Sequence, residues 1–149
     1  MKIGIAADHG GFELKEKLKV QLEKQYLSIS DFGADAYDAN DDYPDFAIPL
    51  AKAVGMGLVD RGIVLCGSGV GACFTANKVK GVRAALLTET YSAHQGVEHD
   101  DMNMICIGGR VVGEELAWEI VQAFLKAQYS GEARHERRLD KVKQLEKEQ

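Results

Sequence analysis

The chain has 149 residues, of which 46% are hydrophobic and 28% are charged, with a formal net charge of −5. This length is most simply one domain with a substantial core, and the acidic balance argues against a nucleic-acid partner, because phosphate-tracking surfaces are strongly basic. No apolar run approaches the length of a membrane span, and no signal-peptide segment precedes the first expected strand. The three cysteines have neither CxxC nor metal-ligand spacing, so we expect no bound metal and a reducing, cytoplasmic environment.

Short apolar runs alternate with helical patterns along the chain, which is typical of βαβ units. The expected strands span residues 3–7, 26–30, 62–66, 82–87 and 104–107. The expected helices span residues 11–25, 44–54, 72–79, 91–98 and 114–128. This alternation predicts one Rossmann-like, doubly wound α/β domain over residues 1–149, with a five-stranded parallel sheet and helices on both faces.

Residues 131–149 form a charged tail in which Leu139, Val142 and Leu145 are spaced for a final helix. This apolar stripe is too thin to bury the helix by itself. We therefore expect the C-terminal helix to pack on a neighbouring surface, that of a second subunit.

The apolar run of residues 63–66 ends in Cys66 and leads into three alternating glycines, Gly67, Gly69 and Gly71. In open α/β sheets, ligands bind outside the carboxyl ends of the strands, so we expect this thiol at the ligand edge of the sheet. Glycines let the backbone turn sharply and approach a ligand, and the N-terminus of the following helix favours negative charge. These N–H groups would stabilise a thiolate or an oxyanion, although many free cysteines are simply small buried hydrophobes.

Two further segments follow strands and are expected at the same edge. Asp8 and His9 come after the first strand, and Arg110 comes after the fifth. His9 precedes two glycines and is well placed to donate to a ligand oxygen, whereas Asp8 equally suits a helix cap. His99 and Asp100 belong to a polar group before the fifth strand, and we interpret His99 as an acid–base residue at this ligand edge.

Two arginines of the tail are candidates for binding a phosphate group. Arg134 and Arg138 are four residues apart, so they share one face of the expected helix. Such a pair can hold one phosphate jointly through charged hydrogen bonds. The alternative is a solvated charged helix in which these arginines pair with Glu132 and Glu136.

Taken in order, these motifs resemble the type B ribose-5-phosphate isomerase family, which also includes allose-6-phosphate and galactose-6-phosphate isomerases. The resemblance covers nearly the whole chain, and the cysteine–glycine segment with a downstream Ala-Asn-Lys is specific. The matching segments are Asp8-His9-Gly10-Gly11-Phe12, Asp42-Tyr43-Pro44-Asp45-Phe46, Cys66-Gly67-Ser68-Gly69-Val70-Gly71, Ala76-Asn77-Lys78-Val79, Gly81-Val82-Arg83-Ala84, Gly108-Gly109-Arg110-Val111-Val112-Gly113 and Arg134-His135-Glu136-Arg137-Arg138.

The resemblance implies an aldose–ketose isomerase that uses neither a metal nor an organic cofactor. It implies Cys66 as the base that moves a proton between C1 and C2, and His99 as the group that opens the furanose ring. The enediolate oxygens would be stabilised by the Ser68 hydroxyl and by the backbone amides of Gly67, Ser68, Gly69, Val70 and Gly71. The phosphate would be held by His9, Arg134 and Arg138, and further contacts with the substrate would come from Asp8, Asp100 and Arg110. Members of the family are homodimers or dimers of dimers whose sites are built from both subunits.

Three positions bear on which sugar phosphate is the substrate. Asp100 stands where ribose-specific members usually carry asparagine, which adds a negative charge beside the sugar. Ala72 stands where one branch of the family carries a glutamate base, which leaves Cys66 as the base. His99 favours a furanose-opening enzyme over a galactose-6-phosphate isomerase. Ribose 5-phosphate is the expected substrate, and allose 6-phosphate, galactose 6-phosphate and a tetrose phosphate are the alternatives.

Three other functions compete with an isomerase. A dinucleotide site would use Gly67, Gly69 and Ala72, but this motif follows the third strand, and 149 residues leave little room for a substrate domain. A cysteine phosphatase needs arginine six residues after its cysteine, where this chain has Ala72. A sugar-phosphate sensor would bind without turnover, which gives Cys66 and His99 no reason to coexist.

Overall fold

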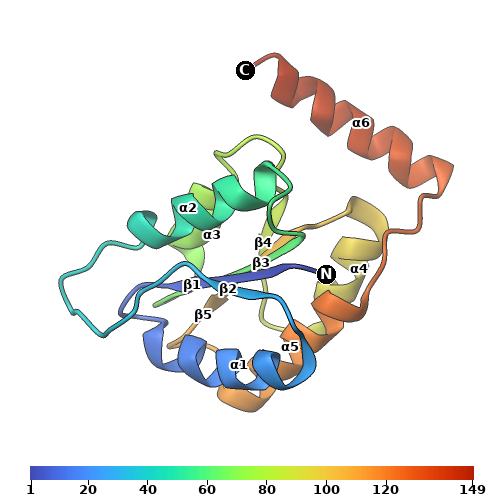
Figure 1. The fold of residues 1–149 in the computed structure, drawn as a ribbon. Helices are drawn as coiled ribbons and strands as arrows, with labels where there is room; N and C mark the ends of the chain where they lie inside the picture. Colours follow the sequence, from blue (N-terminus) through green and yellow to red (C-terminus); the bar gives the residue numbers. More distant parts are fainter.

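The computed structural model describes residues 1–149 as five strands and six helices. The strands form one parallel sheet, as predicted, and their order in it is β2-β1-β3-β5-β4 (Figure 1). The strands are β1 (Ile3–Ala7), β2 (Ile29–Asp31), β3 (Arg61–Cys66), β4 (Ala84–Leu86) and β5 (Met104–Gly108). The helices are α1 (Phe12–Gln25), α2 (Pro44–Gly55), α3 (Val70–Ala76), α4 (Thr90–Asp100), α5 (Glu114–Lys126) and α6 (Ala133–Lys147).

Helices cover both faces of the sheet, so the central strands are buried on each side and consist almost wholly of apolar residues. The α1, α4 and α5 helices pack on one face, where Leu18, Val97 and Phe124 join a single apolar cluster. The α2 and α3 helices pack on the other face, where Leu50 and Ala76 belong to a second cluster (Figure 1). No helix combines the length and the apolar composition that a membrane crossing requires.

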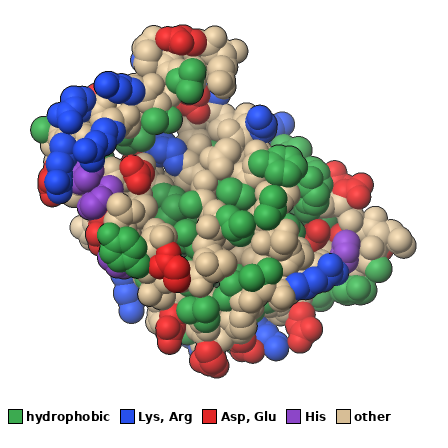
Figure 2. Space-filling view, turned by 180° about the vertical axis from the view of Figure 1, so that it is seen from behind, with side chains coloured by type: hydrophobic (Ala, Val, Ile, Leu, Met, Phe, Trp, Pro, Cys, Tyr) green, Lys and Arg blue, Asp and Glu red, His purple; other side chains and the backbone are tan.

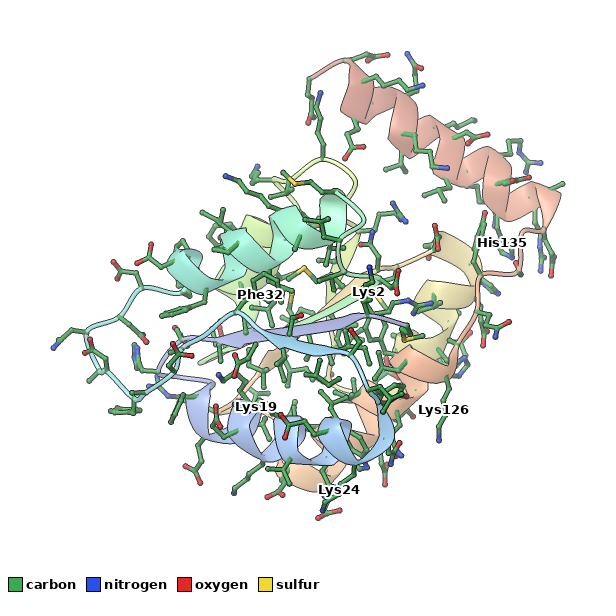
Figure 3. All side chains as sticks on the ribbon, viewed as in Figure 1. Lys2, Lys19, Lys24, Phe32, Lys126 and His135 are labelled. Carbon is green, nitrogen blue, oxygen red and sulfur yellow. The ribbon has the colours of Figure 1, made fainter.

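The final helix, α6, extends away from the two layers (Figure 1). Only two of its side chains, His135 and Leu139, are buried, and Figure 3 shows His135 at the end of α6 beside α4. The Glu146 side chain accepts a hydrogen bond from the backbone N–H of Gly81 at 2.8 Å. Val142 and Leu145 stay exposed, so this chain alone does not cover the stripe predicted for the tail.

Several boundaries differ from those expected. The second strand begins at Ile29 rather than Tyr26, because the N–H of Tyr26 is still bonded to Leu22 of α1 and Ile29 is the residue that pairs with Ile3. The α3 helix ends at Ala76, because the Asn77 side chain turns to bond the backbone of Ala84. The α4 helix extends two residues further than expected, to residue 100.

Candidate active site

Three loops meet in backbone contact at the carboxyl edge of the sheet. The N–H of Gly109 donates to the Cys66 carbonyl at 2.8 Å, and the N–H of Arg110 donates to the Gly67 carbonyl at 3.0 Å. A Cβ on Gly10 would lie 2.6 Å from the Gly67 nitrogen, so only glycine permits this approach. The segments after β1, β3 and β5 are thereby fixed against one another, as predicted from their positions after strands.

The thiol of Cys66 lies at the tip of β3 and is buried. The N–H of Gly69 points back to it, with the nitrogen 3.1 Å from Sγ. This orientation requires Gly69 to adopt φ +83°, in the left-handed region that favours glycine. A backbone donor aimed at sulfur stabilises the negatively charged form of the thiol.

A cavity of about 390 Å³ opens directly beside this thiol. It is lined by Asp8, Tyr43, Cys66, Gly67, Ser68, Gly71, Arg110 and Val111. The Asp8 carboxylate accepts a hydrogen bond from the N–H of Gly10 at 2.9 Å rather than capping α1. Burial raises the pKa of Asp8 above its usual range, an effect that this bond and His9 partly offset. A thiol, a carboxylate and a guanidinium therefore face one small space.

A second cavity, of about 420 Å³, lies on the other side of Arg110 and has His9, Lys17 and Tyr37 in its wall. Arg110 contributes to the walls of both cavities, so one ligand can extend from one to the other. Lys17 is paired with Glu13 and Glu114, which also line this cavity, so His9 and Arg110 are its candidate phosphate-binding groups, next to the cavity that holds the thiol.

Asp8, His9 and Asp41 offer potential ligand atoms within 4.8 Å of one another. The Nδ1 atom of His9, however, already lies 2.6 Å from Oδ1 of Asp41, which is a hydrogen-bond distance. This group is therefore a hydrogen-bonded pair beside a second carboxylate, and we assign no metal to it.

The structure does not place His99 and Asp100 beside Cys66, so the expectation that they share its edge within one chain is wrong. Both lie in the last turn of α4, which returns the chain to the start of β5. With 11 residues, α4 is about 16 Å long at 1.5 Å per residue, and its end lies at the amino edge of the sheet. Residues that precede a parallel strand lie at the edge opposite to those that follow one.

The tail arginines lie at this amino edge as well. Arg134 and Arg138 are exposed in the first turns of α6, and the ring of the intervening His135 stacks on His99. Figure 2 shows histidine side chains at two opposite sides of the molecule, each next to basic side chains. One chain therefore carries two separate groups of candidate residues, which we name the thiol half-site, around Cys66, and the histidine–arginine half-site, around His99.

Three contacts of these half-sites were not anticipated. Asp41 bonds His9 from a loop 32 residues away in the sequence, and no periodic pattern marks such a contact. The Nε2 of Gln95 lies 2.8 Å from Nδ1 of His99, at the i,i+4 spacing that could have been noticed on the helix. His135 belongs to a recognised motif, but its stacking on His99 was not expected.

Comparison with known proteins agrees with this architecture. The Ribose/Galactose Isomerase family model matches residues 3–142. The structure of ribose-5-phosphate isomerase B from Clostridium thermocellum has a TM-score of 0.94 and 46% identity, covering 99% of each chain. That of ribose-5-phosphate isomerase B from Mycoplasma genitalium, with bound ribulose-5-phosphate, has a TM-score of 0.94 and 44% identity, covering 99% of this chain and 97% of that chain. A D-erythrulose-4-phosphate isomerase from Pectobacterium atrosepticum is 41% identical over 131 residues, which cover 88% of this chain and 86% of the relative.

Proposed function

This chain is a sugar-phosphate isomerase of the Ribose/Galactose Isomerase family, and we propose that it interconverts ribose 5-phosphate and ribulose 5-phosphate. The observation that carries this proposal is the Cys66 thiol, which faces a cavity shared with Asp8 and Arg110 and accepts an N–H bond from Gly69. The Mycoplasma relative that binds ribulose-5-phosphate is 44% identical, which supports this substrate.

In the proposed mechanism, the Cys66 thiolate removes the proton from C2 of the open-chain aldose. The C–H electrons form the C1=C2 bond of an enediolate, and negative charge moves onto O1. The Ser68 hydroxyl and the amides of residues 67–71 would stabilise the oxyanion, and three residues of this loop, Gly67, Ser68 and Gly71, line the cavity. A proton then passes from the Cys66 thiol, where it exchanges with solvent, to C1, while the O2 hydroxyl proton moves to O1, which leaves a ketone at C2. His99 opens the furanose ring beforehand.

The phosphate is assigned to the second cavity. His9 and Arg110 line it, and Arg134 and Arg138 would complete it from a second copy of the chain. Asp8 and Asp100 contact the sugar hydroxyls in this arrangement. A phosphate bound away from the reacting carbons supplies binding energy that orients C1 and C2 against the thiol.

The protein acts as a homodimer in this proposal, because each chain has the thiol half-site at the carboxyl edge of its sheet and the histidine–arginine half-site at the amino edge. An exposed apolar surface adjoins the thiol cavity and includes Val70, Phe74, Leu86 and Val111. Figure 2 shows hydrophobic side chains gathered across this side of the molecule. A two-fold dimer that covers this surface would bring the histidine–arginine half-site of one copy to the thiol half-site of the other. Residues 1–149 then form one domain whose segment 131–149 packs on the partner, and the three free cysteines suit the cytoplasm.

A four-carbon sugar phosphate is the second candidate substrate. The Pectobacterium relative at 41% identity is a D-erythrulose-4-phosphate isomerase. Asp100 would add a negatively charged hydrogen-bond acceptor beside the sugar, where ribose-specific members of the family usually carry asparagine. The two candidates differ in chain length and in whether the assayed sugar is the aldose or the ketose, and both are substrates for the same type of proton transfer between C1 and C2, so parallel assays compare them.

The test is turnover in deuterated water with ribose 5-phosphate and with D-erythrulose 4-phosphate, following product formation and deuterium at the carbon that exchanges. We expect turnover with exchange on ribose 5-phosphate, and its loss in Cys66→Ala. Cys73→Ala is the matched thiol control and keeps activity, because Cys73 lies outside the thiol cavity. Faster turnover of the tetrose phosphate would move the assignment to the second candidate. If both sugar phosphates bind but neither exchanges deuterium, the protein is better described as a sugar-phosphate sensor.

A further inference from the structure

A loop contact outside the recognised motifs holds one of the phosphate-binding candidates. Asp41 lies between β2 and α2, and its Oδ1 accepts two bonds from His9, one from the backbone N–H at 2.9 Å and one involving Nδ1 at 2.6 Å. The Asp41 side chain is 10% exposed and that of His9 is 25% exposed. The aspartate therefore fixes both the backbone and the ring of His9 from a nearly buried position.

The contact determines which nitrogen of His9 faces the ligand. An ionised carboxylate only accepts hydrogen bonds, so Nδ1 must carry a proton in this pair. The second ring nitrogen, Nε2, remains available on a side chain that lines the second cavity. The Tyr37 ring meets the imidazole edge-on, with centroids 6.2 Å apart, and restricts its rotation further.

We propose that Asp41 is a positioning residue that holds His9 as a doubly protonated donor, with Nε2–H directed at the substrate phosphate. This inference rests on the proposed function, because it takes the ligand of the second cavity to be a phosphate. Asp41 itself touches neither the substrate nor the reacting atoms. It acts through the charge and orientation of His9.

The charges around the pair favour this protonated form. The hydrogen bond that His9 donates to Asp41 raises the pKa of His9, and the nearby Asp8 carboxylate adds to the effect, whereas burial and Arg110 oppose it. The other carboxylate oxygen of Asp41, Oδ2, is buried and has no hydrogen-bond partner. His9 is thus the group that compensates the charge of the nearly buried Asp41 carboxylate, and this compensation further stabilises the hydrogen-bonded pair. An imidazolium binds a phosphate dianion more strongly than a neutral ring does.

The test compares Asp41→Asn with Asp35→Asn, which removes the same charge from an exposed residue of the same loop that bonds no other group. At pH 8, we expect Asp41→Asn to raise the KM for ribose 5-phosphate about tenfold, as expected for losing a hydrogen bond to a charged group. The value of kcat should change less than twofold, because the thiol half-site is untouched. The difference in KM should shrink at pH 6, where His9 is protonated without help from Asp41. Asp35→Asn should match the wild type at both pH values.

Nitrogen-15 NMR of the His9 ring provides a readout that needs no turnover. In the wild type, the ring should titrate above the ordinary value near 6.5, and its signals should shift when inorganic phosphate is added. In Asp41→Asn, the midpoint should fall and the shift with phosphate should weaken. A wild-type ring that titrates at or below its ordinary value, or that ignores phosphate, overturns the proposal even if Asp41→Asn does not fold. If the signals of the His9 ring shift on addition of phosphate but no sugar phosphate is turned over, the isomerase assignment is refuted. The role of Asp41 in positioning His9 would then still be supported.

Discussion

The imidazole rings of His99 and His135 stack with centroids 4.0 Å apart and planes 18° from parallel. His99 closes the last turn of α4 and His135 lies in the first turn of α6, so the stack is a principal attachment of the final helix. His135 is 3% exposed, and its Nε2 is buried without a hydrogen-bond partner. Two rings in this arrangement do not both accept protons without repulsion.

The stack predicts that α6 loosens on acidification. Burial lowers the pKa of His135, and His99 and Arg134 lower it further. Because the unfolded chain then binds more protons than the folded one below about pH 6.5, the stabilising contribution of neutral His135 is lost as the pH falls through that range. The protection factors of the α6 amides, which correct for the slower intrinsic exchange at lower pH, should therefore fall between pH 7.5 and pH 5.5. His135→Phe keeps a stacked ring without a titrating nitrogen, so its α6 should show a smaller pH dependence; equal dependence in both proteins would contradict the prediction.

The sequence is sufficient to predict the thiol half-site, and the reason is topological. Asp8, Cys66 and Arg110 each follow a strand, and the carboxyl ends of parallel strands meet at one edge whatever the details of packing. The prediction that His99 lies at this same edge was wrong. His99 precedes β5, so the alternation of strand and helix places it at the opposite edge.

Contacts between distant loops were beyond sequence analysis. The four-residue spacing of Leu14, Leu18 and Leu22 is typical of the buried face of a helix, but it does not indicate that Lys15, next to Leu14, is fully buried as well. Its Nζ bonds Asp31 at 2.9 Å and the Ala34 carbonyl, partners that only the folded loop supplies. The pairing of Asp41 with His9 depends on the same loop, and no local propensity or periodicity encodes it.

The backbone at Gly69 provides a second prediction. In Gly69→Ala, a Cβ would lie 2.5 Å from Leu86 Cδ1, and the left-handed φ of +83° would itself cost about 1–2 kcal/mol. Whether the backbone shifts away from Leu86 or leaves the left-handed region, the N–H that points at Cys66 moves. We therefore expect kcat to fall about 10- to 100-fold, together with a lower Tm. The matched control is Gly57→Ala, which has φ +71° but open space around the new Cβ. It should lower the Tm and leave kcat unchanged; an equal loss of kcat in both variants would argue against a role for the amide.

The two other cysteines form a pair whose reactivity can be measured. A hydrogen bond from Cys106 lowers the pKa of Cys73 to about 7, and Cys73 is only half-buried. Iodoacetamide should therefore label Cys73 with a half-maximal rate near pH 7, followed by peptide mass mapping. In Cys106→Ala the donor is lost, and the half-maximal rate should move to higher pH. An unchanged profile in that variant would show that Cys106 does not stabilise the Cys73 thiolate.

Complementation between inactive variants tests the division of the site between two chains. Cys66→Ala and His99→Ala should each be inactive as homodimers, because each removes one half-site from both active sites. In a mixed two-fold dimer, one site carries both substitutions and the other carries neither, so random reassociation should restore about a quarter of wild-type activity. The control mixes Cys66→Ala with Asp8→Ala. Both residues line the same cavity of one chain, so every site of that mixed dimer keeps one substitution and no activity should return. Recovery in the control, or none in the first mixture despite exchange of subunits, would contradict a site shared between two copies.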